Sequence, residues 1–146
     1  MQQLPVKFLR EGAKLPTYGS DAAAGADLYA CLEQSVNIAP GETAMIPTGL
    51  AMEIPAGYVG LICARSGLSI RRGLAPANKV GVIDADYRGE VLVALYNHGS
   101  EAQTVEPGER IAQFLLTPCL TADFVQTDTL HDTVRGEGGF GSTGRK

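Results

Sequence analysis

Two carboxylates stand close together in the segment 81–90, which reads Gly-Val-Ile-Asp-Ala-Asp-Tyr-Arg-Gly-Glu. Asp84 and Asp86 follow a run of apolar residues and, if the backbone stays extended, point to the same side. One of them could act as a general base that activates water, with the ring of Tyr87 as a wall for a substrate ring. The alternative is an Asp-rich turn in which these side chains bond backbone N–H groups and Arg88 is their counter-charge.

A second polar segment, 64–69, reads Ala-Arg-Ser-Gly-Leu-Ser and opens a predicted helix directly after a predicted strand. The first turn of a helix presents free N–H groups and partial positive charge, which favour an anion. Arg65 and Ser66 would add a charge and a hydroxyl, so phosphate is the natural candidate. Alternatively, Arg65 only pairs with a surface carboxylate and Ser66 only caps the helix.

The segment 135–144, Arg-Gly-Glu-Gly-Gly-Phe-Gly-Ser-Thr-Gly, matches the dinucleotide pattern G-x-G-x-x-G. That match is rejected, because no strand precedes it and too few residues remain for a helix. The P-loop pattern also fails, since Ser142 stands where Lys is required. The segment nevertheless carries a cation, an aromatic ring and two hydroxyls on a glycine-rich chain, at Arg135, Phe140, Ser142 and Thr143. It could order as a lid over a phosphorylated ligand, or remain a disordered tail.

Two further polar residues lie within predicted strands. Asp27 could orient metal-bound water, although a polar residue at a strand edge is the commoner explanation. Gln113 stands among apolar residues, where a buried amide needs hydrogen-bond partners. His98 and His131 lie in polar loops and are assigned to the surface.

Short strands are expected to position these groups. Apolar residues come in runs of about four to eight bounded by turn residues, and 18 glycines and 8 prolines supply many turns. The predicted strands cover residues 6–9, 27–30, 43–48, 50–54, 58–63, 79–84, 91–97, 110–117 and 124–126. Such a pattern predicts a sandwich or jelly-roll barrel. One short helix is expected at 66–72, with Ser66 as its N-cap and Gly73 as its terminating residue.

Two of these runs, 58–63 and 91–96, are apolar on consecutive positions. Both faces of those strands should therefore be covered. In a small chain, the cover could be a second layer of the same subunit or a neighbouring subunit.

Composition limits the class of protein. A length of 146 residues with 45% hydrophobic residues fits one domain with a core. The net charge of −4 and the lack of a Lys/Arg block argue against a nucleic-acid polymer as a partner. Three widely spaced cysteines suit a reducing compartment. Without a signal-like or membrane-spanning run, the expected location is cytoplasmic, with no membrane contact.

These segments resemble the five ordered motifs of the trimeric dUTPase family. The corresponding residues are 24–30, 64–69, 81–90, 108–113 and 135–144, and they span nearly the whole chain. The resemblance implies a single jelly-roll domain, a distorted barrel of the β-clip type, at 1–134 and a flexible glycine-rich C-terminal arm at 135–146. It also implies a homotrimer with three shared active sites, each built from three chains and closed by the arm of a neighbour.

The same resemblance implies an activity, the hydrolysis of dUTP to dUMP and pyrophosphate, which keeps uracil out of DNA and supplies dUMP for thymidylate synthesis. Asp84 would activate the water that attacks the α-phosphorus, with Gln113 and Ser66 near the bridging and α-phosphate oxygens. Arg65 and Ser66 would hold phosphates. Mg²⁺ would bind the triphosphate and meet Asp27 only through water, as suits a cation that dehydrates reluctantly.

Selectivity would come from segment 75–82, a strand-turn-strand finger that holds uracil through its backbone. A hairpin pressed against C5 leaves no room for the methyl group of thymine, and fixed donors and acceptors mismatch the amino group of cytosine. Tyr87 under the deoxyribose would exclude a 2′-hydroxyl, and Phe140 would stack over the base. The implied substrate-binding residues are Arg65, Ser66, Gly67, Asn78, Gly81, Val82, Ile83, Tyr87, Arg135, Phe140, Gly141, Ser142 and Thr143.

Gly67 departs from the family pattern, because many relatives have Ser at this position. Two other functions stay open. A dCTP deaminase, or a bifunctional relative, shares the fold and binds a deoxypyrimidine triphosphate, and ammonia release from dCTP would identify it. A non-catalytic, nucleotide-sensing trimer would bind nucleotide without turnover.

Overall fold

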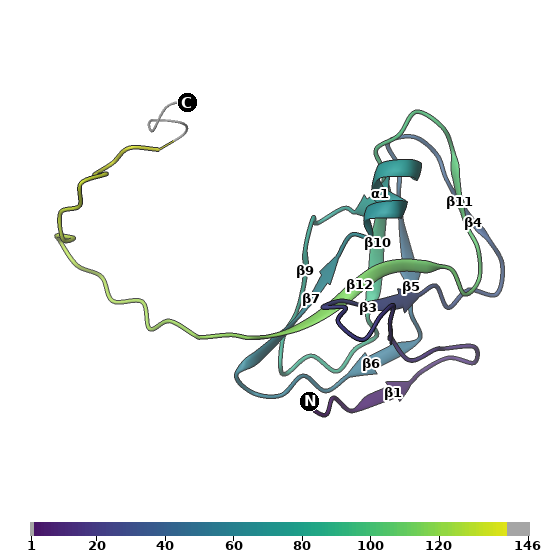
Figure 1. Cartoon of the computed structure of the whole chain (residues 1–146), viewed down its shortest axis with the longest axis horizontal. Coiled ribbons are helices and arrows are strands. Elements are labelled where there is room, and N and C mark those ends of the chain that lie inside the picture. Colours follow the sequence, from purple (N-terminus) through teal and green to yellow (C-terminus); the bar gives the residue numbers. More distant parts are fainter. Residues whose placement is uncertain (1, 140–146) are drawn as a thin grey trace.

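Short strands and one helix make up the body of the chain (Figure 1). The computed structural model describes residues 2–139. The strands are β1 (Val6–Phe8), β2 (Thr17–Tyr18), β3 (Ala26–Tyr29), β4 (Val36–Ile38), β5 (Thr43–Pro47), β6 (Leu50–Met52), β7 (Tyr58–Cys63), β8 (Leu74–Pro76), β9 (Gly81–Ile83), β10 (Leu92–Asn97), β11 (Gln103–Val105) and β12 (Arg110–Pro118), and the helix is α1 (Ser66–Arg72). The prediction of an all-β fold with one short helix at 66–72 is confirmed.

The strands form antiparallel sheets. The largest has the order β2-β3-β12-β7-β9, a second has the order β5-β10-β8, and the remaining two are the pairs β1-β6 and β11-β4. Within residues 2–139, none of these sheets closes on itself into a complete barrel. β9 lies at an edge of the largest sheet, so the outer edge of its backbone has no paired strand in the described chain.

Inward-pointing side chains from the sheets form a shared hydrophobic core. On β10, Val93 and Leu95 are buried, whereas Leu92 points outward and is 42% exposed, as alternation along a strand requires. Burying each such aliphatic side chain contributes about 1.5–3 kcal/mol. The largest fully buried side chains are Leu28, Ile38, Ile46, Leu50, Met52, Ile54, Leu74, Leu95, Ile111, Val91, Val93 and Val105.

Within residues 2–139, the outward face of the β5-β10-β8 sheet is not fully covered. Met45 on β5 is 58% exposed and pairs in register with Ala94, two residues from Leu92. The expectation that both faces of the 91–96 run are covered is therefore not met inside a single subunit.

The sequence predicts the end of helix α1 correctly but not its N-cap. Arg65, not Ser66, is the N-cap, and no side chain caps the helix, so the capping role predicted for Ser66 is wrong. Gly73 ends the helix in the left-handed conformation with φ of 67°, as predicted, and its N–H bonds the carbonyl of Ser69. Leu68 is the buried residue that anchors the helix to the core.

Most predicted strands are present, and the bounds of β7 are those predicted. The prediction of a strand at 124–126 is wrong, because this segment has no paired strand and Phe124 is 94% exposed. Three short strands, β2, β4 and β11, were not predicted. β8 corresponds to the first strand of the predicted 75–82 finger.

The chain leaves the body after β12. In Figure 1 the yellow-green segment that follows Pro118 runs away from the sheets, and it carries several exposed apolar side chains, including Leu120 and Leu130. The N–H of Cys119 still bonds the carbonyl of Gly57, which fixes the point of departure. Among residues 2–139, no helix has the length and apolar character that a membrane crossing needs.

Candidate active site

A buried carboxylate organises the polar end of the largest sheet. Asp27 on β3 is 4% exposed, and its two oxygens accept hydrogen bonds from Arg65 Nε at 2.7 Å and from Arg110 Nη1 at 3.2 Å. A buried charge is tolerated only when paired and hydrogen-bonded, and two guanidinium groups satisfy that need. Asp27 is thus an interior residue that holds two arginines, and the expectation of a strand-edge position is wrong.

Arg65 and Ser66 lie where β7 passes into α1. The pairing of Arg65 with Asp27 matches the alternative reading of Arg65 as an ion-pair partner, except that the carboxylate is buried. Ser66 and Gly67 are exposed at the start of the helix, and the Ser66 side chain caps nothing. The first N–H groups of α1 therefore have no capping side chain, and an exposed hydroxyl lies beside them.

Gln113 lies beside this cluster on β12. It pairs in register with Asp27 on one side and with Cys63, the last residue of β7, on the other. Gly25 makes room for its side chain, because a Cβ on Gly25 would lie 3.1 Å from the Cβ of Gln113. Asp27, Arg65, Ser66 and Gln113 thus gather at one end of β7, which we call the arginine end.

The finger predicted at 75–82 consists of β8, a turn and β9. Its two strands do not pair with each other, so the predicted hairpin is wrong: β8 pairs with β10, and β9 pairs with β7. In the turn, the N–H of Lys79 bonds the carbonyl of Pro76, and Lys79 itself adopts a positive φ of 67°. The finger is therefore held from outside by two different sheets.

A small depression of about 140 Å³ opens beside the finger. Asn78 and Val82 on its lining are exposed, and a Cβ on Gly81 would approach Asn78 Nδ2 to 3.4 Å. The other lining residues are Met45, Ile62, Pro76, Gly81, Ile83, Leu92, Val93 and Ala94. The hollow is apolar and offers one amide and the edge strand β9. A flat ring with polar groups on its rim would fit these features.

Asp84 directly follows β9 at the start of a turn. The N–H of Tyr87 bonds the carbonyl of Asp84 at 3.2 Å, so the expectation of an extended backbone with Asp84 and Asp86 on the same side is wrong. Asp84, Asp86 and Tyr87 are all exposed. The turn of the alternative reading is present, but among residues 2–139 no backbone N–H donates to the side chain of Asp84 or Asp86, and Arg88 is not their counter-charge because it pairs with Glu53.

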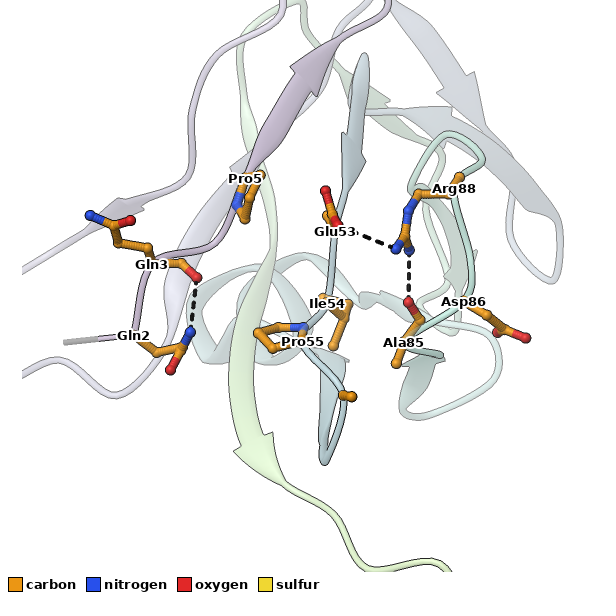
Figure 2. Close-up of a pocket in the computed structure, with 10 residues that line it drawn as sticks. Gln2, Gln3, Pro5, Glu53, Ile54, Pro55, Ala85, Asp86 and Arg88 are labelled. Atoms are coloured by element: carbon orange, nitrogen blue, oxygen red, sulfur yellow. Dashed lines mark hydrogen bonds and ion pairs between the residues drawn. The ribbon is translucent and has the colours of Figure 1, made fainter.

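Arg88 supports this turn from within. Its Nη1 donates to the carbonyl of Ala85 at 2.7 Å, and its Nη2 lies 3.7 Å from Glu53 (Figure 2). Nη1 also donates to the carbonyl of Tyr87 at 3.0 Å. These groups line a cavity of about 520 Å³ together with the N-terminal segment. Arg88 is therefore a counter-charge of Glu53 and a brace of the turn.

Within one chain, Asp84 and the arginine end lie far apart. β9 runs antiparallel to β7, with Ile83 opposite Gly60, whereas Arg65 follows Cys63 at the other end of β7. At about 3.3 Å per residue, these two groups are separated by roughly 15 Å or more along the strand. Within one chain, the carboxylate of Asp84 and the arginine end are therefore too far apart to contact the same phosphate group.

The last predicted residues fall partly beyond the described chain. Arg135 is exposed, and its Nε donates to the carbonyl of Gly138 at 2.7 Å. Phe140, Gly141, Ser142 and Thr143 lie outside the described residues.

A comparison with known families matches the dUTPase family model to residues 11–144. The chain belongs to the dUTPase family. Among relatives of this dUTPase-family chain, the deoxyuridine 5'-triphosphate nucleotidohydrolase of Desulfitobacterium hafniense (strain DSM 10664 / DCB-2) is 54% identical over 132 residues, covering 90% of this chain and 87% of the relative. The enzyme of the same name from Enterobacter sp. (strain 638) is 46% identical over 151 residues, covering 100% and 99%.

Solved dUTPase structures share the fold. The dUTPase of Staphylococcus bacteriophage 80alpha with dUPNHPP has a TM-score of 0.89 and 31% identity, covering 99% of each chain. A mutant dUTPase of phage phi11 of S. aureus, described with a structural Mg(II) ion, has a TM-score of 0.79 and 27% identity, covering 88% of this chain and 98% of that one. The predicted family and the predicted jelly-roll-like fold are confirmed.

Sequence reasoning missed two residues beside the arginine end. Arg110 was not singled out, although it holds Asp27, and Gly25 was not recognised as the space that Gln113 needs. A β-bulge between Arg110 and Ala112 shifts the register of β12 against β3. Simple alternation therefore cannot place Arg110 on the correct side, and only the charge pairing with Asp27 could have indicated it.

Proposed function

We propose that this dUTPase-family chain hydrolyses dUTP to dUMP and pyrophosphate, with water attacking the α-phosphorus. The observation that carries the proposal is the family match over residues 11–144, joined by relatives named deoxyuridine 5'-triphosphate nucleotidohydrolase that cover the chain almost fully. A family neighbour is also described with dUPNHPP. The proposed product, dUMP, is the compound that thymidylate synthesis uses, and the hydrolysis of dUTP would keep uracil out of DNA.

In this proposal, Asp84 is the general base. An exposed carboxylate at the tip of a braced turn can orient a water and accept its proton, and the base need not be strong when the phosphorus is well placed and its charge is neutralised. Gln113 and Ser66 would contact the bridging and α-phosphate oxygens, and Arg65 and Gly67 would add charge and backbone N–H groups. The buried bond to Asp27 keeps Arg65 in place for that task.

The uracil ring would lie in the depression beside the finger. β9 is an edge strand, so backbone groups on the outer edge of Gly81, Val82 and Ile83 are available to a base in a fixed pattern of donors and acceptors. Asn78 adds an amide on the same lining. A cytosine ring would mismatch this pattern, and unpaired polar groups in a closed site are costly.

Magnesium is proposed to arrive with the substrate, bound to the triphosphate. Within residues 2–139, no group of three or more His, Cys, Asp or Glu side chains could hold a metal ion. Asp27 has both oxygens bonded to arginines and is buried, so any contact with the ion is indirect, through water. Bound there, Mg²⁺ would neutralise charge on the phosphates.

A homotrimer is proposed because the site is incomplete in one chain. Asp84 and the arginine end lie at opposite ends of β7, so a shared site needs Asp84 of one copy beside Arg65 of another. Exposed Met45 and Leu92 on the outward sheet face offer an apolar surface for such contact. The barrel domain at 1–134, the closing arm at 135–146 with Arg135 and the residues after it, and the cytoplasmic location stay predictions.

The proposed function is tested by incubating the full-length protein with dUTP and Mg²⁺ and measuring pyrophosphate. Stoichiometric dUMP and pyrophosphate are expected, together with strong loss of rate after chelation of Mg²⁺. Ammonia release from dCTP would instead assign the chain to the deaminase branch. Tight dUTP binding without any product would identify a nucleotide-sensing protein.

Tyr87→Ala is expected to admit UTP. The exposed ring would lie under the deoxyribose, and its removal opens space for a 2′-hydroxyl. The ratio of kcat/KM for dUTP to that for UTP should fall by about 10-fold or more, since a lost steric contact of this size is worth about 1–3 kcal/mol. Pyrophosphate release with both nucleotides measures it. Unchanged discrimination would place the sugar gate elsewhere.

A further inference from the structure

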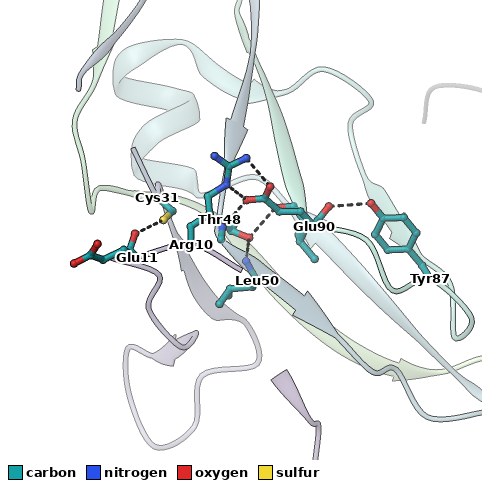
Figure 3. A network of polar contacts seen from close by, with 9 residues as sticks. Arg10, Glu11, Cys31, Thr48, Leu50, Tyr87 and Glu90 are labelled. Atoms are coloured by element: carbon teal, nitrogen blue, oxygen red, sulfur yellow. Dashed lines mark hydrogen bonds and ion pairs between the residues drawn. The ribbon is translucent and has the colours of Figure 1, made fainter. Parts of the chain in front are cut away.

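Glu90 is held by an unusually complete set of bonds (Figure 3). Its carboxylate accepts from Arg10 Nε at 2.7 Å, from Arg10 Nη2 at 2.8 Å and from the N–H of Gly49 at 2.9 Å. The hydrogen bond and charge of Arg10 hold the pKa of the Glu90 carboxyl below its ordinary value, so the group stays ionised at neutral pH. Two parallel guanidinium bonds fix orientation as well as charge.

The backbone around Glu90 is equally fixed. The N–H of Val91 bonds the carbonyl of Leu50, and Thr48 Oγ1 donates to the carbonyl of Val91 at 2.7 Å. Arg10 itself follows β1, where the N–H of Leu9 bonds the carbonyl of Gly49. Segments 80 residues apart in sequence are thereby joined at one carboxylate.

Tyr87 rests on the opposite side of this residue. Its hydroxyl donates to the backbone carbonyl of Glu90 at 2.9 Å, as Figure 3 shows. The ring lies across Gly89, where a Cβ would come within 2.6 Å of Tyr87 Cζ. Tyr87 is 42% exposed, and the hydrogen bond to Glu90 joins its ring to the backbone of this segment.

We propose that the Arg10–Glu90 pair positions Tyr87 and so sets the discrimination between deoxyribose and ribose nucleotides, an inference that rests on the proposed function. Glu90 is a positioning residue, because its carboxylate faces Arg10 while its carbonyl holds Tyr87. The pair fixes the peptide at Glu90, and the peptide fixes the phenol. The N–H of the same peptide, that of Val91, also bonds the carbonyl of Leu50, so release of the carboxylate removes one of two restraints on the peptide and the ring of Tyr87 is held less firmly.

Glu90→Gln tests the proposal with little change of shape. The amide removes the charge and turns an N–H₂ group toward Arg10, so the pair loses its fork geometry. The ratio of kcat/KM for dUTP to that for UTP is expected to fall by about three- to tenfold, less than for Tyr87→Ala. Arg10→Ala should match Glu90→Gln, and Arg10→Lys should restore part of the ratio because it keeps the charge without the fork.

Glu53→Gln is the matched control, because it breaks an exposed ion pair with Arg88 near the same turn and should leave the ratio unchanged. A general loss of stability would lower kcat/KM for both substrates together and would leave their ratio unchanged. If Tyr87→Ala relaxes discrimination while Glu90→Gln does not, the positioning role is refuted and the proposed function stands.

A second readout does not depend on activity. In protein with labelled tyrosine, the Tyr87 ring resonance, assigned with Tyr87→Phe, should shift or broaden in Glu90→Gln and Arg10→Ala but not in Glu53→Gln. A Tyr87 resonance unaffected by both variants would overturn the inference, whether or not the protein hydrolyses dUTP. A wild-type protein without turnover would overturn the proposed function, whereas the positioning of Tyr87 by the Arg10–Glu90 pair would still be tested by this resonance.

Discussion

Asp84→Asn is expected to lower kcat by about 10²- to 10⁴-fold, because the variant keeps the shape of the turn but loses the group that accepts a proton from water. Nucleotide affinity should change little, since Asp84 is exposed at the tip of the turn and holds no other described side chain in place. Pyrophosphate release gives kcat, and calorimetry with dUPNHPP gives the dissociation constant.

Asp86→Asn is the matched control for this prediction. Asp86 lies in the same turn, is also exposed, and lines the cavity beside Arg88, so it tests any general effect of removing a charge there. It should keep most of the activity. A near-normal rate in Asp84→Asn, or an equal loss in both variants, would remove Asp84 from the role of base.

The same variant also tests the shared site. Asp84→Asn and Arg65→Ala subunits should each be inactive, but mixed assemblies should recover activity, because some sites then combine an intact Asp84 with an intact Arg65 from another copy. Random mixing restores roughly a quarter of the sites in a cyclic assembly. No recovery after unfolding and refolding the mixture would show that both groups serve one site from one chain.

Truncation after Leu130 is expected to preserve the fold and the assembly. It should lower kcat/KM by about 100-fold or more, because the segment that would close over the bound nucleotide is lost. The fold should survive because the described part of the removed segment makes only local bonds, such as Arg135 Nε to Gly138 and the N–H of Gly136 to Thr133. Light scattering reports the assembly, and pyrophosphate release reports the activity.

A smaller truncation separates the contributions within the arm. Removal of residues 140–146 alone leaves Arg135 in place and should already produce most of the loss if stacking by Phe140 and the hydroxyls of Ser142 and Thr143 carries closure. Phe140→Ala should fall between this truncation and the full-length protein. A fully active protein that ends at Leu130 would refute the closing role of the arm.

The sequence predicts elements best where local signals agree with burial. β7 is predicted to the residue, because an apolar run is bounded by a turn at Gly57 and by the polar start of α1, and α1 itself is ended by Gly73. The weak strands β2 and β11 escape notice because they are short, and their existence depends on partners distant in sequence. The segment 124–126 has the apolar pattern of a strand, but no strand in the described part of the chain pairs with it.

The candidate site is predictable as a list of residues and not as an arrangement. The motifs indicate which side chains are polar in apolar surroundings, such as Asp27 and Gln113. They do not reveal that Asp27 holds both Arg65 and Arg110, because a bulge and two long-range strand pairings bring these groups together. They also hide the distance between Asp84 and Arg65, which follows only from the antiparallel pairing of β9 with β7.

The placement of Asp84 and the arginine end at opposite ends of β7 has a consequence for mixed populations. Under the shared-site proposal, an isolated subunit is inactive even when it is fully folded. Dilution to concentrations at which the assembly dissociates would therefore abolish turnover without denaturation. A copy damaged both at Asp84 and at the arginine end inactivates two active sites in every assembly that it joins. Copies damaged at both ends would therefore suppress intact ones, and the loss of rate would exceed their share of the protein present.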